Sequence, residues 1–566
     1  MSKKSAGPLA GPKTERSVPA APAPPARQTT NLPTDTVGAF EAAPRVDQVI
    51  EGLALVLLTY LPLAFGGVLP FSHAVLIATA GVIAALFAVR CFVEQGAAFV
   101  WSWGYVPAAA FVALVALQVT PLPIGLIELV SPHTAEIWRT AATDAALSGL
   151  ATEPVTWATL SLYPAGTWTD LRVLLASLTI FFVLTSIYRE KAAFRRLLAG
   201  AGLIGMLVAT IGVVQLLLGA DKIYWTFDSP VRVITAGPFA SYSHYSEFLN
   251  LCLGCTLGYL LVRAMDRSHG RPIELRDLID LRPTDGMWLD RALMMFLVLG
   301  ALAIALSTSR NGLISLFFAG AVTAIAMQLT RKVDGVGWPM VGLAGVAFLA
   351  LLALGFDPIY ERMSTTMDDP IEAYGVRADL ARDTFRMATA LPLLGAGFGT
   401  YWVSFPMFDT SVRGGTAANA ENQYLEFLGE TGFLGGLCVL VGLGLVIAAL
   451  VRLSSQSRSR TNIAGFGLMY GVAAIAFHST TDFGLEIPAV GLLTCVVAAA
   501  AFSRASRTVT LATRPRFIAG GVAVALAGAL ALSIQPTMAQ HTTQTATFVR
   551  EALHRKMAPP NFRGTP

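Results

Sequence analysis

The stretch ALMMFLVLGALAIALSTSRNGLISLFFAGAVTAIAMQLT, residues 292–330, decides the fold class. It contains two apolar runs separated by Arg310, the one charged residue in it. Each run is close to the ~20 residues that cross a bilayer as a helix. Similar runs recur along the chain, so that 54% of the 566 residues are hydrophobic and 13% are charged. Because soluble proteins carry about 25% charged residues, we expect an all-α polytopic membrane protein.

About thirteen apolar runs reach the length of a membrane span. They lie near residues 49–66, 72–90, 105–121, 169–188, 197–219, 244–263, 290–307, 311–329, 338–356, 424–451, 463–480, 485–503 and 517–535. Residues 1–46 are rich in proline and alanine and contain almost no large apolar side chains, which predicts a disordered arm. We therefore expect this arm, a membrane domain over 47–505, and a last part, 506–566, with one extra span and a tail.

Basic residues are unevenly distributed between the connections, and this predicts the orientation of the chain. Connections rich in Lys and Arg alternate with nearly uncharged ones, and all of the rich ones fall on one side: 189–196, 263–282, 331–332, 452–460 and 504–516. The positive-inside rule places them, and the amino-terminal arm, in the cytoplasm. Two long segments, 122–168 and 357–423, then form periplasmic loops, and the tail, 536–566, ends in the periplasm. This topology is expected of a protein of a bacterial inner membrane.

Two arginines of the outer segments are candidate anion ligands. Arg310 lies between two spans with almost no loop, where a charge costs about 2.5–3.5 kcal/mol, so such residues usually face a cavity. Its guanidinium matches phosphate oxygens bidentately, although a snorkelling arginine at a helix end is the alternative. Arg377 opens a helix predicted over 376–391. Arg382 on that helix can pair with neighbouring acidic residues, whereas Arg377 has no clear partner in the helix.

The candidate general base is Glu421, in the string AENQYLEFLGETG, where the second long loop re-enters the membrane. A carboxylate there can accept a proton from a hydroxyl within hydrogen-bond reach, and the alternative is a helix-start charge favoured by the dipole. Glu426 and Glu430 are expected to face a wet groove. Residues that could support the site are Asn422, Tyr424, Arg382, His244, His478 and Asp482. For the histidines and Asp482, and for Glu247 near His244, a structural role at an outer helix end is the simpler interpretation.

No metal site is expected from the cysteines. All five lie in or beside apolar runs. The Cys252-x-x-Cys255 spacing resembles half of a zinc motif, but no further ligands stand nearby in the sequence. We expect these side chains to pack against lipid or neighbouring helices.

With these strings the chain resembles the O-antigen ligase and polysaccharide polymerase superfamily of integral-membrane glycosyltransferases. The resemblance covers roughly residues 105–503, and the strings occur in the family's order: GPFASYSHYSEFLNLCLG, STSRNGL, RADLARDT with PLLGAGFGTYW, AENQYLEFLGETGFLG and HSTTDFGLEIPA. It implies a GT-C-type helical fold, undecaprenyl-pyrophosphate-linked glycan donors, and chemistry without a metal or other cofactor. Arg310 matches the arginine of the family's serine–arginine motif and Arg377 the one that opens the loop helix. Both would hold the donor pyrophosphate.

The sequence departs from its relatives at Glu421, because AEN stands where ligases usually have AHN. A carboxylate can still deprotonate a sugar hydroxyl, so we expect an inverting polymerase of lipid-linked repeat units for exopolysaccharide or O-antigen. Expected partners are the lipid-linked donor, the glycan acceptor, membrane lipids and a chain-length regulator or export proteins, but no nucleic acid. Three alternatives stay open: a ligase that transfers glycan to lipid A–core or another acceptor, a transporter or flippase, and an assembly protein without activity.

Overall fold

The computed structural model describes residues 45–93, 99–147, 154–227, 237–269, 271–274, 277, 286–333, 370–410, 417–456, 459–506, 517–534 and 536–537, with side chains omitted for 370–376. Helices account for nearly all of the regular structure in these ranges, beside one two-stranded pair. The expected all-α polytopic fold is therefore confirmed.

Eleven of the described helices are long and apolar enough to cross a membrane. They are α1 (Arg45–Leu63), α2 (Pro70–Val93), α6 (Pro164–Ile187), α7 (Lys191–Leu217), α8 (Tyr242–Arg267), α10 (Met287–Leu306), α11 (Arg310–Thr330), α16 (Gln423–Ser455), η3 with α17 (Arg460–His478), α18 (Pro488–Ala505) and an unlabelled last helix (Phe517–Ile534). They match eleven of the expected runs. The run near 105–121 forms the shorter apolar helix α3 (Tyr105–Gln118), and the run near 338–356 lies outside the described residues.

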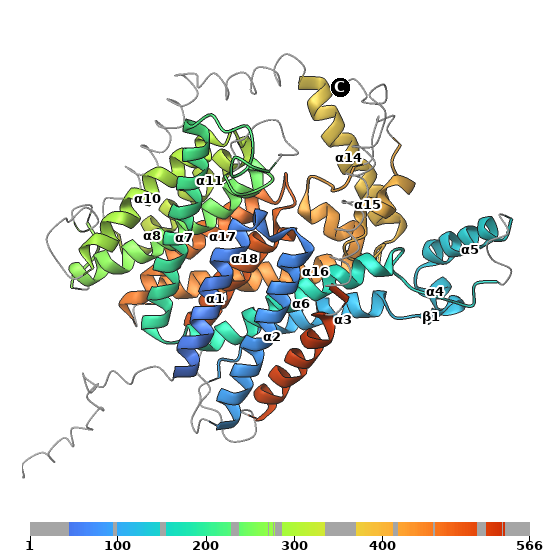
Figure 1. The fold of residues 1–566 in the computed structure, drawn as a ribbon, viewed down its shortest axis with the longest axis horizontal. Helices are drawn as coiled ribbons and strands as arrows, with labels where there is room; N and C mark the ends of the chain where they lie inside the picture. The colour runs from blue at the N-terminus through green and yellow to red at the C-terminus, as the bar shows by residue number, and fades with distance from the viewer. Residues whose placement is uncertain are drawn as a thin grey trace, which may run out of the picture. The chain divides into compact units, whose positions relative to one another are not determined.

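Helix α8 lies at the centre of the bundle, packed against α7, α10, α11 and α17 (Figure 1). Glycines allow the closest of these approaches: a Cβ on Gly467 of α17 would lie 2.2 Å from the backbone nitrogen of Gly258 on α8. Small residues let membrane helices approach at the backbone, where dispersion contacts replace the hydrophobic drive that lipid does not supply. The two helices run in opposite directions, so the start of α8 meets the end of α17.

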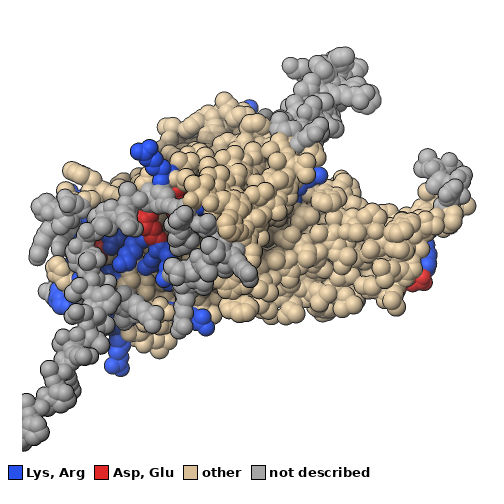
Figure 2. Space-filling model, turned by 90° about the horizontal axis from the view of Figure 1, so that it is seen from below, with Lys and Arg blue, Asp and Glu red and all other residues tan. Residues whose placement is uncertain are grey.

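The outer surface is apolar. Helix α16 and the last helix bury only a small part of their apolar windows, and α16 exposes Phe433, Leu437 and Leu440. Most of the face in Figure 2 carries no Lys, Arg, Asp or Glu apart from a few groups of charged side chains. An uncharged surface of this extent is suited to lipid rather than water.

The first long connection folds into α4 (Ile124–Val130), α5 (Pro132–Leu147) and an antiparallel pair, β1 (Leu122–Pro123) with β2 (Trp157–Ala158). In Figure 1 this group lies to the right of the membrane helices. Gln118, at the end of α3, connects the region to the core, because its side-chain amide donates to the carbonyl oxygens of Leu394 (2.6 Å) and Glu430 (2.8 Å).

The second long connection contains α14 (Pro370–Ala390), a glycine-rich turn, α15 (Tyr401–Ser404) and η2 (Phe405–Met407). The expected helix over 376–391 is present and begins earlier, at Pro370. Gly395 in the turn has φ 67°, and a Cβ there would lie 2.2 Å from the carbonyl carbon of Glu430. The turn therefore packs directly against the backbone of α16, which itself bends at Gly432 (φ 65°).

Candidate functional site

The candidate residues gather at one end of the bundle, where four segments meet. The start of α8 contacts the end of α17 through Ser243 Oγ and His478 Nε2 (2.8 Å). It contacts the α10–α11 junction through Ser246 Oγ, which donates to Ser309 Oγ (3.1 Å). The start of α16 joins them because the amide of Gln423 donates to Ser479 O (3.0 Å).

The opposite end is dominated by paired arginines. Asp290 at the start of α10 accepts hydrogen bonds from Arg263 and Arg267 at the end of α8. Arg196 donates to both carboxylate oxygens of Glu51, at 2.8 and 2.7 Å. The basic residues expected on the cytoplasmic side include these arginines, so the candidate site lies at the other end from them.

Glu421 and Arg377 form the open part of the site. Arg377 Nη2 lies 3.4 Å from Glu421 Oε2, and the two side chains are 54% and 41% exposed. The structure thus brings together the proposed base and one proposed anion ligand, which are 44 positions apart in the chain. Arg382, by contrast, pairs with Asp379 on the same helix and does not reach Glu421.

The backbone aims Glu421 into this position. Its φ of 51° lies in the left-handed region, which costs a non-glycine residue about 1–3 kcal/mol and persists where neighbours fix it. The neighbours on both sides are fixed: Ala420 N donates to Glu426 (2.9 Å), and Asn422 accepts from Leu425 N (3.0 Å) and donates to Thr480 O (2.8 Å). Asn422 is thus the N-cap of α16, as its residue type favours.

The electrostatic surroundings make Glu421 a stronger base than an ordinary glutamate. Burial is the largest cause and raises its pKa, the charge of Asp482 raises it further, and Arg377 and His244 oppose the shift. A carboxylate with a raised pKa holds an abstracted proton more firmly, which favours general-base chemistry near neutral pH.

Arg310 is the first residue of α11 and its side chain is exposed. Its position is fixed by Ser309, the N-cap, whose hydroxyl accepts from Gly312 N (3.0 Å). Among the described residues, Arg310 makes no hydrogen bond or ion pair. Its guanidinium is therefore available to an anion from outside the described chain, and the helix N-terminus below it also favours negative charge.

A buried group of histidines and carboxylates lies behind the open pair. Asp482 Oδ1 is 3.4 Å from His244 Nε2, and Asp482 Oδ2 is 3.5 Å from His478 Nε2. Burial opposes ionisation of Asp482, but the two neighbouring histidines outweigh it and hold the pKa of this carboxyl well below its usual value. Asp482 is therefore a carboxylate that joins α8 to the segment after α17.

Two glutamates of α16 correct the sequence expectation of a wet groove, because both are buried. Glu430 accepts hydrogen bonds from the amides of Gly399 (2.9 Å) and Tyr401 (2.8 Å) and so anchors the glycine-rich turn. Glu426 accepts from the side chain of Asn419 (3.0 Å) and holds the segment that leads into Glu421. Gln423, Glu426 and Glu430 are spaced three and four residues apart, and this spacing indicates that they share one helix face.

Sequence reasoning missed Glu486, in η4 (Gly484–Glu486). It accepts from Gln423 Nε2 (2.8 Å) and Asn419 Nδ2 (3.1 Å), and burial raises its pKa. Tyr424, a supporting candidate, donates its hydroxyl to Ala476 O (2.8 Å) and therefore fastens α16 to α17. Both side chains position the start of α16 rather than face the open pair.

The sequence of the segment that carries these residues matches a known protein family. Residues 295–440 match the family model described as O-antigen ligase, and this segment contains Arg310, Arg377 and Glu421. No curated protein matches the chain. Residues 295–440 of this multi-pass membrane protein are therefore similar to O-antigen ligases.

Proposed function

We propose that the protein is an inverting glycosyltransferase of the bacterial inner membrane that polymerises lipid-linked oligosaccharide repeat units at the periplasmic face. The observation that carries the proposal is the half-exposed Glu421–Arg377 pair (3.4 Å), held in a left-handed backbone conformation at one end of the bundle. A base beside a cation is the arrangement needed to activate a hydroxyl next to an anionic leaving group.

In the proposed reaction Glu421 takes the proton of an acceptor hydroxyl. The hydroxyl oxygen attacks the anomeric carbon of the donor glycan from the face opposite the leaving group. The bond between that carbon and the phosphate oxygen breaks, and undecaprenyl pyrophosphate departs with the electron pair. Arg377 and Arg310 hold the pyrophosphate by bidentate hydrogen bonds and stabilise its developing charge.

The placement of ionisable residues favours this proposal over a transporter. A transporter keeps its binding groups near the bilayer midplane between repeated halves. Here Arg310 and Glu421 stand at the starts of α11 and α16, and Arg377 lies within α14 of the second long connection. The family match supports lipid-linked glycan as the substrate class. The glutamate at position 421 favours a polymerase over a ligase that uses an imidazole at this position.

The test replaces the chromosomal gene by variants and analyses the lipid-linked glycans. Glu421→Gln and Arg310→Ala are the test variants, and Arg382→Ala is the matched control because this exposed arginine pairs within its own helix. Single repeat units that accumulate on the lipid carrier support a polymerase. Long chains that stay on the carrier instead identify a ligase, and unchanged glycans, with the variant proteins present in the membrane at normal amounts, overturn the enzymatic proposal.

A further inference from the structure

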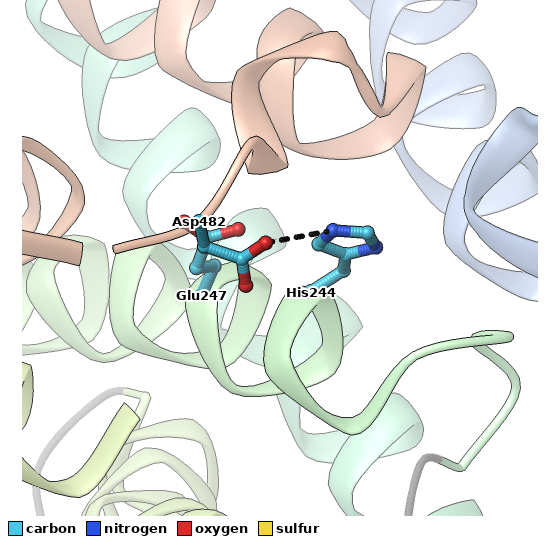
Figure 3. A group of neighbouring side chains, drawn as sticks. All are labelled: His244, Glu247 and Asp482. Carbon is cyan, nitrogen blue, oxygen red and sulfur yellow. Dashed lines mark ion pairs between the residues drawn. The ribbon is translucent and has the colours of Figure 1, made fainter. Parts of the chain in front are cut away.

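Three buried side chains meet beside the open pair. Figure 3 shows His244 and Glu247 of α8 with Asp482, which approaches from the segment after α17. One potential ligand atom of each lies within 4.8 Å of the other two. All three residues are buried, and Glu247 is only 1% exposed.

Glu247 is the unexplained member of this group. Neither of its carboxylate oxygens has a hydrogen-bond partner among the described residues. An unpaired buried carboxyl is costly, and native proteins almost always provide a partner. Glycine at position 484 leaves room for this side chain: a Cβ there would lie only 1.4 Å from Glu247 Oε2.

One separation in the group is compatible with a pair of metal ligands. His244 Nε2 and Asp482 Oδ1 are 3.4 Å apart, longer than the ~2.7–2.9 Å of a charge-assisted hydrogen bond. Two ligands at about 2.0–2.1 Å from a tetrahedral zinc ion are about 3.3–3.4 Å apart. The observed separation is therefore the edge expected of a tetrahedron around such an ion.

We propose that His244 Nε2, one carboxylate oxygen of Glu247 and one of Asp482 bind a divalent transition cation of the zinc or manganese class. His244 offers a nitrogen and the two carboxyl groups offer oxygens, and zinc and manganese both accept imidazole and carboxylate ligands. A water completes the coordination. The cation supplies the missing partner of Glu247.

His478 supports this site without binding the cation. Its Nε2 is engaged by Ser243 (2.8 Å), and it approaches the second oxygen of Asp482 at 3.5 Å, so it orients that carboxylate. Such outer partners are a regular feature of metal sites. The cation takes no part in the proposed glycosyl transfer, and it is distinct from the pyrophosphate-binding arginines.

The cation stabilises the end of the bundle that carries Glu421. Asp482 also accepts, through its backbone carbonyl, a hydrogen bond from Gln423 N (3.1 Å), the first residue of α16. A cation that joins Asp482 to α8 therefore fixes the start of α16 relative to the bundle centre. Removal of the ion loosens that connection, and we expect it to lower the thermal stability of the protein.

The test measures metal content and thermal unfolding of the full-length protein in lipid nanodiscs. The protein is stripped with a chelator, loaded with Zn²⁺ or Mn²⁺, washed and analysed by mass spectrometry of the metal. We expect about one equivalent of one of the two ions in the wild type and a higher unfolding temperature after loading. Neither result depends on glycan activity, so the outcome is separate from that of the proposed function.

Glu247→Gln is the test variant, and Glu426→Gln is the matched control, a buried glutamate whose two oxygens already have partners. Glu247→Gln should bind the cation at least about tenfold more weakly, while Glu426→Gln keeps one equivalent. The inference is overturned if loaded wild type holds no stoichiometric Zn²⁺ or Mn²⁺. It is also overturned if folded Glu247→Gln protein keeps the wild-type content, because the ion then binds elsewhere.

Discussion

Replacement of Glu421 by glycine should abolish activity and leave the fold intact. Glu421 adopts φ 51°, a conformation that glycine adopts without strain, and its side chain is 41% exposed. Its one hydrogen bond among the described residues is the 3.4 Å contact with Arg377. Catalysis and stability therefore make opposite demands on this position.

The expected stability change follows from three small contributions. Relief of the left-handed strain stabilises the variant by about 1–2 kcal/mol. The added backbone freedom of glycine in the unfolded chain costs about 0.5–1 kcal/mol, and loss of a half-exposed ion pair costs about 0–1 kcal/mol. The sum lies between about 1 kcal/mol of destabilisation and about 1.5 kcal/mol of stabilisation. Loss of a general base, in contrast, lowers turnover by about 10²–10⁴-fold.

The assay compares thermal unfolding in nanodiscs with the glycan profile of the corresponding strain. Asn422→Ala serves as the control for sensitivity, because loss of an N-cap that makes two hydrogen bonds costs about 1 kcal/mol or more. A Glu421→Gly protein that unfolds far below the wild type, or one that still makes normal polymer, would refute the reasoning. The first result would make Glu421 a structural residue and the second would exclude it as the base.

Three further predictions concern the same end of the bundle and the packing behind it. Burial and Asp482 raise the pKa of Glu421, so the polymerase rate in membranes should fall as pH drops through a value above the ordinary ~4.3 of glutamate. The residual rate of Glu421→Gln should lack this acidic limb. Arg310→Lys should recover only a small part of the activity lost in Arg310→Ala, since an ammonium cannot bind pyrophosphate with two parallel hydrogen bonds; full recovery, measured by polymer yield, would rule out bidentate binding. Gly467→Ala would place a Cβ 2.2 Å from Gly258 N, and overpacking of this kind costs about 1–3 kcal/mol or more, so its unfolding temperature should drop clearly; an unchanged value would contradict the close helix contact.

The membrane helices could be predicted from the sequence because each of them satisfies its own backbone hydrogen bonds within one apolar run. The α10–α11 junction shows this most clearly, since the helix begins at Arg310, the one charged residue of the quoted stretch. α3 is shorter than its apolar run. Gln118 at its end bonds backbone carbonyls of two distant segments, and such a partner is invisible in a local pattern.

The site was less predictable because its contacts join residues far apart in the chain. The sequence around His244 and the sequence around His478 do not indicate that both side chains approach Asp482. The burial of Glu430 likewise depends on the glycine-rich turn that binds it, 29 and 31 positions earlier. Periodicity tells which residues share a helix face, but the segment that covers that face is a property of the tertiary fold.

The surroundings of Glu421 set the direction of its side chain. Ala420 is held by Glu426, and Asn422 by Leu425 and Thr480, so the backbone direction at 421 is set by its neighbours rather than by its own side chain. Strain at a single residue survives only where such neighbours over-determine it. A histidine or a glutamate at 421 would therefore project into the same open space beside Arg377. In the proposed reaction, the residue type would set the pKa of the proton acceptor, while the backbone of the loop would set where the proton is accepted.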